Sequence, residues 1–378
     1  MRYSGHILVL VLLASFLPSG HLEAQGGLKL AKKIVKKVQG LFTDTHNLED
    51  IYLLEDSRVV GTDPSFLVRQ TGFSKYHFNL FSDFVVGEYD INPETGLPRS
   101  ESSFLHYQNE LFAGDDKMNI LQTARDVNPR INTLLLLSYR SDYGQNKEYS
   151  TYYTRHFFEN KDRAQDSLLT RLQNTFAKWQ DEYKLPEDRI GVVLDFQGLP
   201  KDKKLQQQFP NLVERLKSEG WLVFVKLPLD FTKTGFFSDA NTLAAVEKSA
   251  DLFLLTAYSY DIPNPLAYDC SSPTDMHALE ETLKAIKDKN LIPRQKLVVE
   301  FPGFGRAVTR DEEGFSFQSN VANGAIVDQH AMQAGTPIEY RDSAQYAYAR
   351  FKDPYTEGHN YCFEDSTTIS RKFRWLLD

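Results

Sequence analysis

Short apolar runs alternate with longer amphipathic stretches along most of the chain. Seven runs have the length and composition of strands, and residues 134–137 are four successive leucines, as in a strand buried on both faces. The predicted strands cover residues 57–61, 77–89, 132–138, 190–196, 221–227, 251–258 and 296–301. Apolar residues at helical spacing predict helices over residues 164–183, 205–219, 241–249, 276–288 and 366–377.

Strands separated by helices of this length are typical of parallel βαβ units. The rhythm fits both an eight-stranded (β/α) barrel and a doubly wound sheet, and periodicity alone does not choose between them. The sequence has no internal repeat and no linker-like stretch after residue 50. Residues 49–378 are therefore predicted to form one domain.

The first 24 residues have the pattern of a signal peptide. Arg2 supplies a positive start, residues 7–17 form a short apolar stretch, and Ala24 offers a small residue for cleavage. The apolar stretch is too short to span a bilayer comfortably, and no other stretch is a better candidate. The sequence therefore predicts a secreted, periplasmic or extracellular protein with no membrane span.

Residues 25–48 form a basic amphipathic linker, in which lysines alternate with an apolar stripe between Leu28 and Val38. This segment could contact an anionic membrane surface or a glycan. Alternatively, it is a solvated linker or a helix packed on the barrel.

Composition excludes several functional classes. The net charge is −8, and the only basic cluster is in the linker, so no nucleic-acid interface is predicted. The sequence contains no His-Glu-x-x-His or Cys-x-x-Cys pattern and no phosphate-cradling glycine loop, so neither a metal nor a cofactor is predicted. Aromatic residues make up 13%, which suits either a large core or a surface that stacks on sugar rings.

The chain has two cysteines, Cys270 and Cys362. In an oxidising compartment they could pair, closing a loop of about 90 residues and adding roughly 4 kcal/mol of stability. Two unpaired thiols are the alternative.

In a (β/α) barrel, functional side chains lie at the carboxyl ends of the strands and in the loops that follow. One such end is Gly191-Val192-Val193-Leu194-Asp195, where a carboxylate closes an apolar strand. A carboxylate buried without a partner is costly, so Asp195 is either a site acid or the cap of the next loop or helix.

Residues 190–198, with the order Leu194-Asp195-Phe196-Gln197-Gly198, resemble the fourth-strand signature of family 18 glycoside hydrolases, the chitinase family. That signature runs Asp-Gly-x-Asp-x-Asp-aromatic-Glu. Four further segments resemble the family's second, fifth, sixth and seventh strand regions in the right order, at residues 78–96, 225–231, 254–260 and 291–306. The resemblance covers residues 55–378 and implies a TIM-type barrel.

The family's retaining mechanism is substrate-assisted. The resemblance implies that Asp195 orients the sugar's acetamide and that Tyr258 bonds the ring formed from it. Gln197 takes the place of the glutamate that protonates the leaving oxygen, and a glutamine amide cannot supply that proton. Three further polar positions of the family pattern also differ, at Ile190, Val193 and Ser259. Together these changes suggest that the family's charge network is lost.

By the same resemblance, a groove at the mouth of the barrel would bind the glycan. The residues expected to bind substrate there are Tyr139, Phe196, Tyr260, Phe304 and Arg306. Each aromatic residue has a place in the core as its alternative.

Three hypotheses follow. The first is a non-hydrolytic protein that binds a glycan containing N-acetylglucosamine, such as a chitooligosaccharide, peptidoglycan or an N-glycan. The second is a protein-interaction scaffold of the cell envelope with a vestigial groove. The third is an active glycosidase that uses a replacement acid, for which Asp230, Asp261 and Glu300 are candidates. Whether the chain is an enzyme stays open, and the glutamine favours the view that it is not.

The resemblance also predicts an eighth strand after the final helix, but the sequence ends at Asp378. The expectation is a barrel that lacks its eighth strand or a sequence truncated before it.

Overall fold

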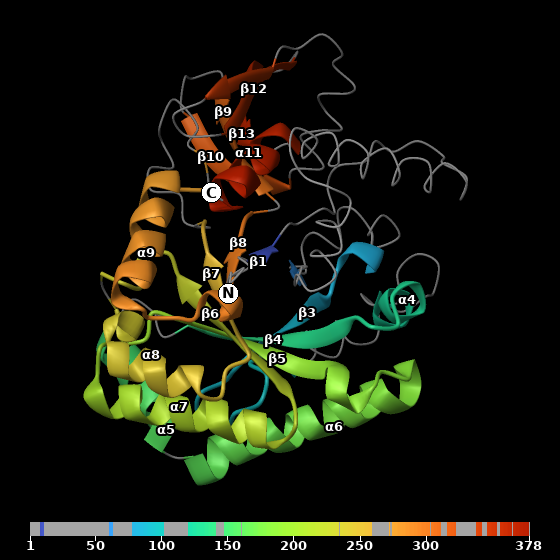
Figure 1. Cartoon of the computed structure of the whole chain (residues 1–378), viewed down its shortest axis with the longest axis vertical. Coiled ribbons are helices and arrows are strands. Elements are labelled where there is room, and N and C mark those ends of the chain that lie inside the picture. The colour runs from blue at the N-terminus through green and yellow to red at the C-terminus, as the bar shows by residue number, and fades with distance from the viewer. Residues whose placement is uncertain are drawn as a thin grey trace, which may run out of the picture.

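The computed structural model describes residues 8–10, 60–62, 78–101, 120–140, 147–159, 161–233, 235–258, 272, 274–302, 304–310, 316–322, 338–341, 346–353, 356–364 and 366–377. Eight strands form a parallel sheet, and five later strands form an antiparallel sheet. In Figure 1 the antiparallel sheet lies above the parallel one, and helices cover the parallel sheet from below.

The parallel sheet contains β1 (Leu8–Leu10), β2 (Val60–Thr62), β3 (Asp83–Asp90), β4 (Asn132–Arg140), β5 (Ile190–Gln197), β6 (Leu222–Pro228), β7 (Leu252–Thr256) and β8 (Leu297–Glu300). All seven strands predicted from the sequence are present as β2 to β8. Their spatial order follows their sequence order, with β1 beside β8. A doubly wound sheet would reverse this order part-way. The end strands β1 and β2 approach within 8 Å between Cα atoms, as the curvature of a TIM-type (β/α) barrel requires.

Among the described residues, no parallel strand follows β8 in the sequence. The place beside β8 is taken by β1, where Val9 pairs with Val299. These residues belong to the predicted signal peptide, and its removal would take this neighbour away from β8.

The helices connecting the strands are α4 (Ile120–Val127), α5 (Lys147–Glu159), α6 (Asp166–Tyr183), α7 (Lys203–Ser218), α8 (Ala240–Glu247) and α9 (Met276–Lys289). A π turn (Lys161–Gln165) precedes α6, and 3-10 turns occur at Phe78–Leu80, Glu187–Arg189, Phe236–Ser238 and Arg294–Lys296. Asp202, Asp239 and Asp275 cap α7, α8 and α9 by accepting hydrogen bonds from backbone N–H groups. None of the described helices is both long and apolar enough to span a bilayer.

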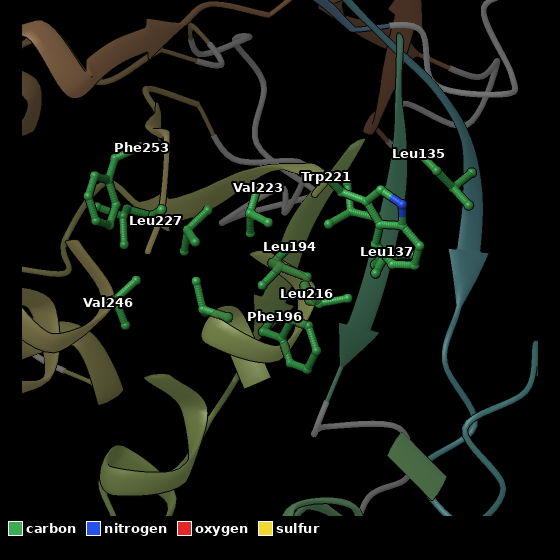
Figure 2. Packing of buried hydrophobic residues seen from close by; sticks show 14 of the residues in the cluster. Leu135, Leu137, Leu194, Phe196, Leu216, Trp221, Val223, Leu227, Val246 and Phe253 are labelled. Atoms are coloured by element: carbon green, nitrogen blue, oxygen red, sulfur yellow. The ribbon is translucent and has the colours of Figure 1, made fainter. Parts of the chain in front are cut away.

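Alternation along the strands sorts the core into two layers. On β5, Leu194 and Phe196 point outward and pack with helix residues such as Leu216 of α7 (Figure 2). Val193 points inward, into a small apolar cluster at the centre of the barrel. That cluster takes alternate residues from six strands: Val85, Leu134, Val193, Phe224, Leu252, Leu254 and Val298.

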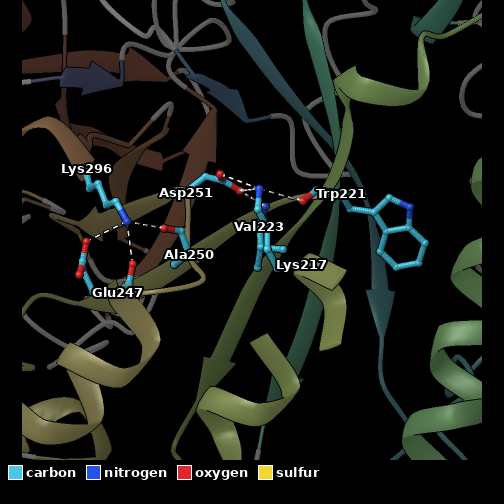
Figure 3. Close-up of polar contacts among 7 residues, drawn as sticks. All are labelled: Lys217, Trp221, Val223, Glu247, Ala250, Asp251 and Lys296. Atoms are coloured by element: carbon cyan, nitrogen blue, oxygen red, sulfur yellow. Dashed lines mark hydrogen bonds and ion pairs between the residues drawn. The ribbon is translucent and has the colours of Figure 1, made fainter. Parts of the chain in front are cut away.

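Polar contacts fasten the amino-terminal ends of three neighbouring strands (Figure 3). The carboxylate of Asp251 accepts from the Val223 amide at 2.8 Å and pairs with Lys217 at 2.8 Å, which ties α7 to β6 and β7. Beside β8, Lys296 pairs with Glu247 at 2.8 Å and donates to the Ala250 carbonyl at 3.0 Å. These contacts lie at the other end of the strands from Asp195.

The antiparallel sheet follows β8 and was not predicted. It contains β9 (Phe304–Arg310), β10 (Ser316–Ala322), β11 (Ile338–Arg341), β12 (Tyr346–Asp353) and β13 (Thr356–Phe363), in the order β10-β9-β13-β12-β11. Helix α11 (Ser366–Leu377) follows it and confirms the predicted final helix. Glu364, just before α11, forms a fully buried ion pair with Lys372 inside the helix. Burial lowers the pKa of Lys372, and the nearby carboxylate of Glu364 opposes that change.

Candidate functional site

A polar layer lies at the carboxyl ends of the barrel strands, directly above the central apolar cluster. Its members follow inward-facing apolar residues by two positions, so strand alternation points them into the barrel as well. Asp195 follows Val193, Lys226 follows Phe224, and Glu300 follows Val298. The layer consists of Asp195, Lys226, Thr256 and Glu300 from four neighbouring strands.

Lys226 lies between two carboxylates of this layer. Its Nζ is 3.1 Å from Glu300 Oε2 and 3.6 Å from Asp195 Oδ2. The side chain of Lys226 is 8% exposed and that of Glu300 is 1% exposed, so this is a buried network. The sequence predicted the loss of the family's own charge network, and the network found here consists of other residues. Val193 does replace a family aspartate, but Lys226 and Glu300 supply charges that face Asp195 from neighbouring strands.

Two hydroxyl groups also donate to Glu300. Tyr258 donates to Oε1 at 3.0 Å, and Thr256 donates to Oε2 at 3.2 Å. The ring of Tyr258 lies 6.0 Å from Lys226 Nζ, at the outer limit of a cation–π contact. Glu300 thus has hydrogen-bond partners on both oxygens, as a buried carboxylate requires.

Gln197 lies at the open edge of the layer and is exposed. Its amide Nε2 donates to Asp195, at 3.1 Å from Oδ1 and 3.3 Å from Oδ2. Asp195 therefore accepts from the amide of Gln197 and faces the ammonium of Lys226. In the hydrogen bond from Gln197, Asp195 acts as the acceptor.

A pocket of about 690 Å³ opens over this layer, within the size range of small-molecule sites. Its polar lining includes Arg140, Asp195, Gln197, Lys226, Asp230, Thr256, Tyr258 and Asp275. Its apolar wall includes Leu199, Leu227, Leu229, Phe231, Phe236 and Phe237. An open pocket beside Gln197 counts against a groove filled by the chain's own side chains.

The structure brings Asp195, Gln197 and Tyr258 together around this pocket. It does not bring Tyr139 there. Tyr139 is 1% exposed, its ring packs on Phe196 at 5.4 Å, and its hydroxyl hydrogen-bonds Thr154 at 2.7 Å. Burial raises the pKa of Tyr139, and the hydrogen bond to Thr154 opposes that change.

Phe196 borders the pocket, but its ring also belongs to the outer layer, where it packs edge-on against Phe209 at 5.4 Å. The expectation of two sugar-stacking rings at these positions overlooked the alternation of side chains along the strands. Even-numbered residues of β5 and odd-numbered residues of β4 face the helices.

The remaining predicted residues are elsewhere. Arg306 is buried in β9 and donates to the Ser272 carbonyl at 3.4 Å, and it does not line this pocket. Phe304 begins β9, and its side chain is not described. Tyr260 lies outside the described residues.

The three candidates for a replacement acid also separate. Glu300 lies beneath Lys226 and does not line the pocket. Asp230 lines the pocket and is exposed. Asp261 lies outside the described residues.

Cys362 is disulfide-bonded and fully buried in β13. Cys270 is the only other cysteine of the sequence, and it lies outside the described residues. The described residues contain no cluster of three or more His, Cys, Asp or Glu side chains suited to a metal ion.

The same arrangement of strands and helices occurs in solved chitinases and a related lytic enzyme. A chitinase from Chromobacterium violaceum superposes with a TM-score of 0.57 at 15% identity, over 83% of this chain and 88% of that one. A class V chitinase mutant from Cycas revoluta, solved with (GlcNAc)3, gives 0.55 at 18% identity, over 84% and 90%. The spore cortex-lytic enzyme SleL of Bacillus megaterium gives 0.56 at 18% identity, over 84% and 67%.

The fold is that of the chitinase-like barrels. Identities this low establish the fold alone. No family model and no curated protein matches the sequence.

Proposed function

We propose that this protein is an exported, catalytically degenerate relative of the family 18 glycoside hydrolases. It binds a glycan containing N-acetylglucosamine in the pocket over Asp195 and does not cleave it. The observation that carries this proposal is the hydrogen bond from Gln197 to Asp195 at the floor of an open pocket. It supports a site that still binds an acetamide but has lost the proton needed to release a sugar.

The hydrogen-bond polarity of the site favours a ligand rich in donors. The amide of Gln197 is directed at Asp195, and the hydroxyls of Thr256 and Tyr258 are directed at Glu300. Around Asp195 and Gln197, carboxylate and amide oxygens are left to face the ligand. An acetamido sugar offers one amide N–H and several hydroxyls, which match these acceptors.

The apolar wall of the pocket, which includes Phe231 and Phe236, suits the apolar face of a sugar ring. The solved Cycas revoluta chitinase mutant, which shares this fold, holds (GlcNAc)3. This likeness supports a sugar of that class as the first ligand to test.

Cleavage would require a general acid near the leaving oxygen, and the amide of Gln197 cannot act as one. Glu300 is an unsuitable substitute because it is enclosed and paired with Lys226. Of the three acids predicted as replacements, Asp230 is the one that lines the pocket among the described residues, so the active-enzyme hypothesis depends on it. The other acid of the lining besides Asp195, Asp275, caps α9. The scaffold hypothesis depends on a surface elsewhere and requires no pocket.

Calorimetric titration of chitotriose tests the proposal. We expect saturable binding to the wild type and about 10- to 100-fold weaker binding to Asp195→Ala, the usual effect of losing a hydrogen bond to a charged group. Asp188→Ala is the matched control, because Asp188 is exposed and lies just before the opposite end of β5. Equal affinities for the wild type and Asp195→Ala would refute the assigned site.

A fluorogenic N-acetylglucosaminide assay separates the enzyme alternative. We expect no turnover by the wild type above that of Asp195→Asn. Turnover that Asp230→Asn abolishes would establish the replacement-acid hypothesis instead.

A further inference from the structure

Arg140 is a cation of the pocket that the proposed acetamide site does not use. It is the last residue of β4, it is exposed, and it lines the pocket. Alternation places it on the inward face with Ser138 and Leu136. In the parallel ladder it is the partner of Gln197, so the two residues end adjacent strands about 4.8 Å apart.

The two cations of the pocket wall differ in how their charges are compensated. Lys226 is enclosed by Asp195 and Glu300 at ion-pair distances. The guanidinium of Arg140 makes neither an ion pair nor a hydrogen bond with the described residues, and the carboxylate whose pKa its charge lowers is Asp90, which lies outside the pocket lining. Because two carboxylates enclose Lys226 at ion-pair distances and none encloses Arg140 among the described residues, Arg140 is the positive group that is open to the pocket.

The acids nearest to Arg140 along the barrel rim have other partners. Asp90 forms an ion pair with Arg99 at 3.3 Å. Burial raises the pKa of Asp90, and the charges of Arg99 and Arg140 oppose that change. Glu88 accepts the Ser138 hydroxyl at 2.7 Å. Both are half-buried or surface groups of β3, outside the pocket lining.

A guanidinium presents five N–H donors in a planar fork, which matches the two oxygens of a carboxylate. A neutral hydroxyl gains less from such a group. A ligand whose acetamido sugar lies at Asp195 and Gln197 would bring its neighbouring substituent to the end of β4. We propose that this substituent is a carboxylate, so that the preferred ligand is an acidic glycan in which N-acetylglucosamine is joined to a carboxylate-bearing sugar.

This inference rests on the proposed glycan site and narrows its ligand class. The carboxylate has two common sources with the same chemistry. One is the lactyl ether of a muramic acid unit, and the other is a uronic acid. The pocket floor does not distinguish them, so both belong in the test.

The experiment is a titration of three tetrasaccharides into the full-length exported protein. They are neutral chitotetraose, a peptidoglycan tetrasaccharide with N-acetylmuramic acid, and a hyaluronan tetrasaccharide with glucuronic acid. Each is measured with the wild type, Arg140→Gln and Arg163→Gln, at low and high salt. Arg163 is a matched control because it is exposed and does not line the pocket.

We expect at least one acidic tetrasaccharide to bind the wild type about tenfold more tightly than chitotetraose, the usual effect of a charge-assisted hydrogen bond. The preference should disappear in Arg140→Gln, persist in Arg163→Gln and shrink at high salt. The acidic tetrasaccharide that binds more tightly than chitotetraose identifies the source of the carboxylate.

Equal or tighter binding of chitotetraose would overturn this inference and leave the proposed glycan site in place. A preference that survives in Arg140→Gln would overturn it as well. Failure of all three sugars to bind would overturn the glycan site itself, and this inference with it.

Discussion

The amide nitrogen of Gln197 lies 3.1 Å from Oδ1 of Asp195 and donates to it. The two residues are separated by Phe196, whose ring points toward the helices, so both of their side chains face the barrel mouth. In a pair of carboxyl groups at this distance, one would hold a proton and could act as an acid. Here the second member is an amide, which donates a hydrogen bond to Asp195 and cannot act as an acid.

Replacing Gln197 by glutamate should create such a pair. The pKa of the new carboxyl at position 197 should be higher in the folded protein than in the unfolded chain. The stability that its bound proton contributes is then fully present below the pKa of the unfolded chain, and it is lost as the pH rises through the pKa of the folded protein. Chemical unfolding measures the free energy of unfolding that Gln197→Glu loses relative to the wild type. This loss should be larger at about pH 8 than at about pH 5, by roughly 1–2 kcal/mol. Gln173→Glu is a control, because Gln173 donates to Glu219 at 2.7 Å on the exposed surface. An equal loss at both pH values would contradict the account.

Lys226→Met should destabilise the fold strongly. The change leaves Glu300, which is fully buried, beside Asp195 without a cation. Breaking a buried pair in this way costs about 3–5 kcal/mol of unfolding free energy. Adding Glu300→Gln should recover most of the loss in urea unfolding. A double variant as unstable as Lys226→Met alone would show that Lys226 acts through packing and not through charge.

Asp202→Ala should lower stability by about 1 kcal/mol at neutral pH, because Asp202 caps α7. The hydrogen bond from Arg155, followed by the backbone amides of α7, lowers the pKa of Asp202 despite some desolvation. Because the pKa of Asp202 is lower in the folded protein, its ionised form contributes stability at pH values above the pKa of the unfolded chain. This contribution is lost as the pH falls through the pKa of the folded protein. The difference from the wild type should shrink by about pH 3 in chemical unfolding. Asp202→Asn, which keeps the cap without the charge, should lose less than the alanine variant.

Tyr139→Phe and Tyr258→Phe should have opposite profiles. Tyr139→Phe removes the buried hydrogen bond with Thr154, which costs about 1 kcal/mol of stability, and leaves chitotriose affinity unchanged. Tyr258 lines the pocket, and Tyr258→Phe removes the hydrogen bond that holds its ring against Glu300, so this change should weaken binding. Calorimetry and thermal unfolding of both variants measure the two effects. Weaker binding by Tyr139→Phe alone would place the ligand outside the pocket described above.

Local patterns were sufficient to predict the parallel strands β2 to β8, though not β1, and most of the helices. Strand β4 shows why, because its four leucines and flanking polar residues fix its length and burial. The alternation along the strands also predicts which way each side chain points, and the prediction of Tyr139 and Phe196 as substrate residues did not take it into account. Counting two residues on from Val193 and Phe224 gives Asp195 and Lys226 on one face.

Relationships between strands far apart in the sequence could not be predicted in the same way. Lys226 and Glu300 are separated in the sequence by the strand β7, two α-helices and two 3-10 turns, and only the barrel brings them to 3.1 Å. The antiparallel sheet was not predicted because its strands follow one another without helices and so depart from the βαβ pattern. In addition, β9 pairs with β13, although β10, β11 and β12 lie between them in the sequence.

The central claim is that the pocket over Gln197 holds an N-acetylglucosamine glycan without cleaving it. The most direct test is one NMR experiment, in which chitotetraose is incubated with the wild-type protein and observed by saturation transfer. The account predicts transfer from the protein to the acetyl methyl protons, abolished in Asp195→Ala, with no new reducing-end signals over the incubation. Absence of transfer, or the growth of new reducing-end signals at a rate above that of Asp195→Ala, would contradict it.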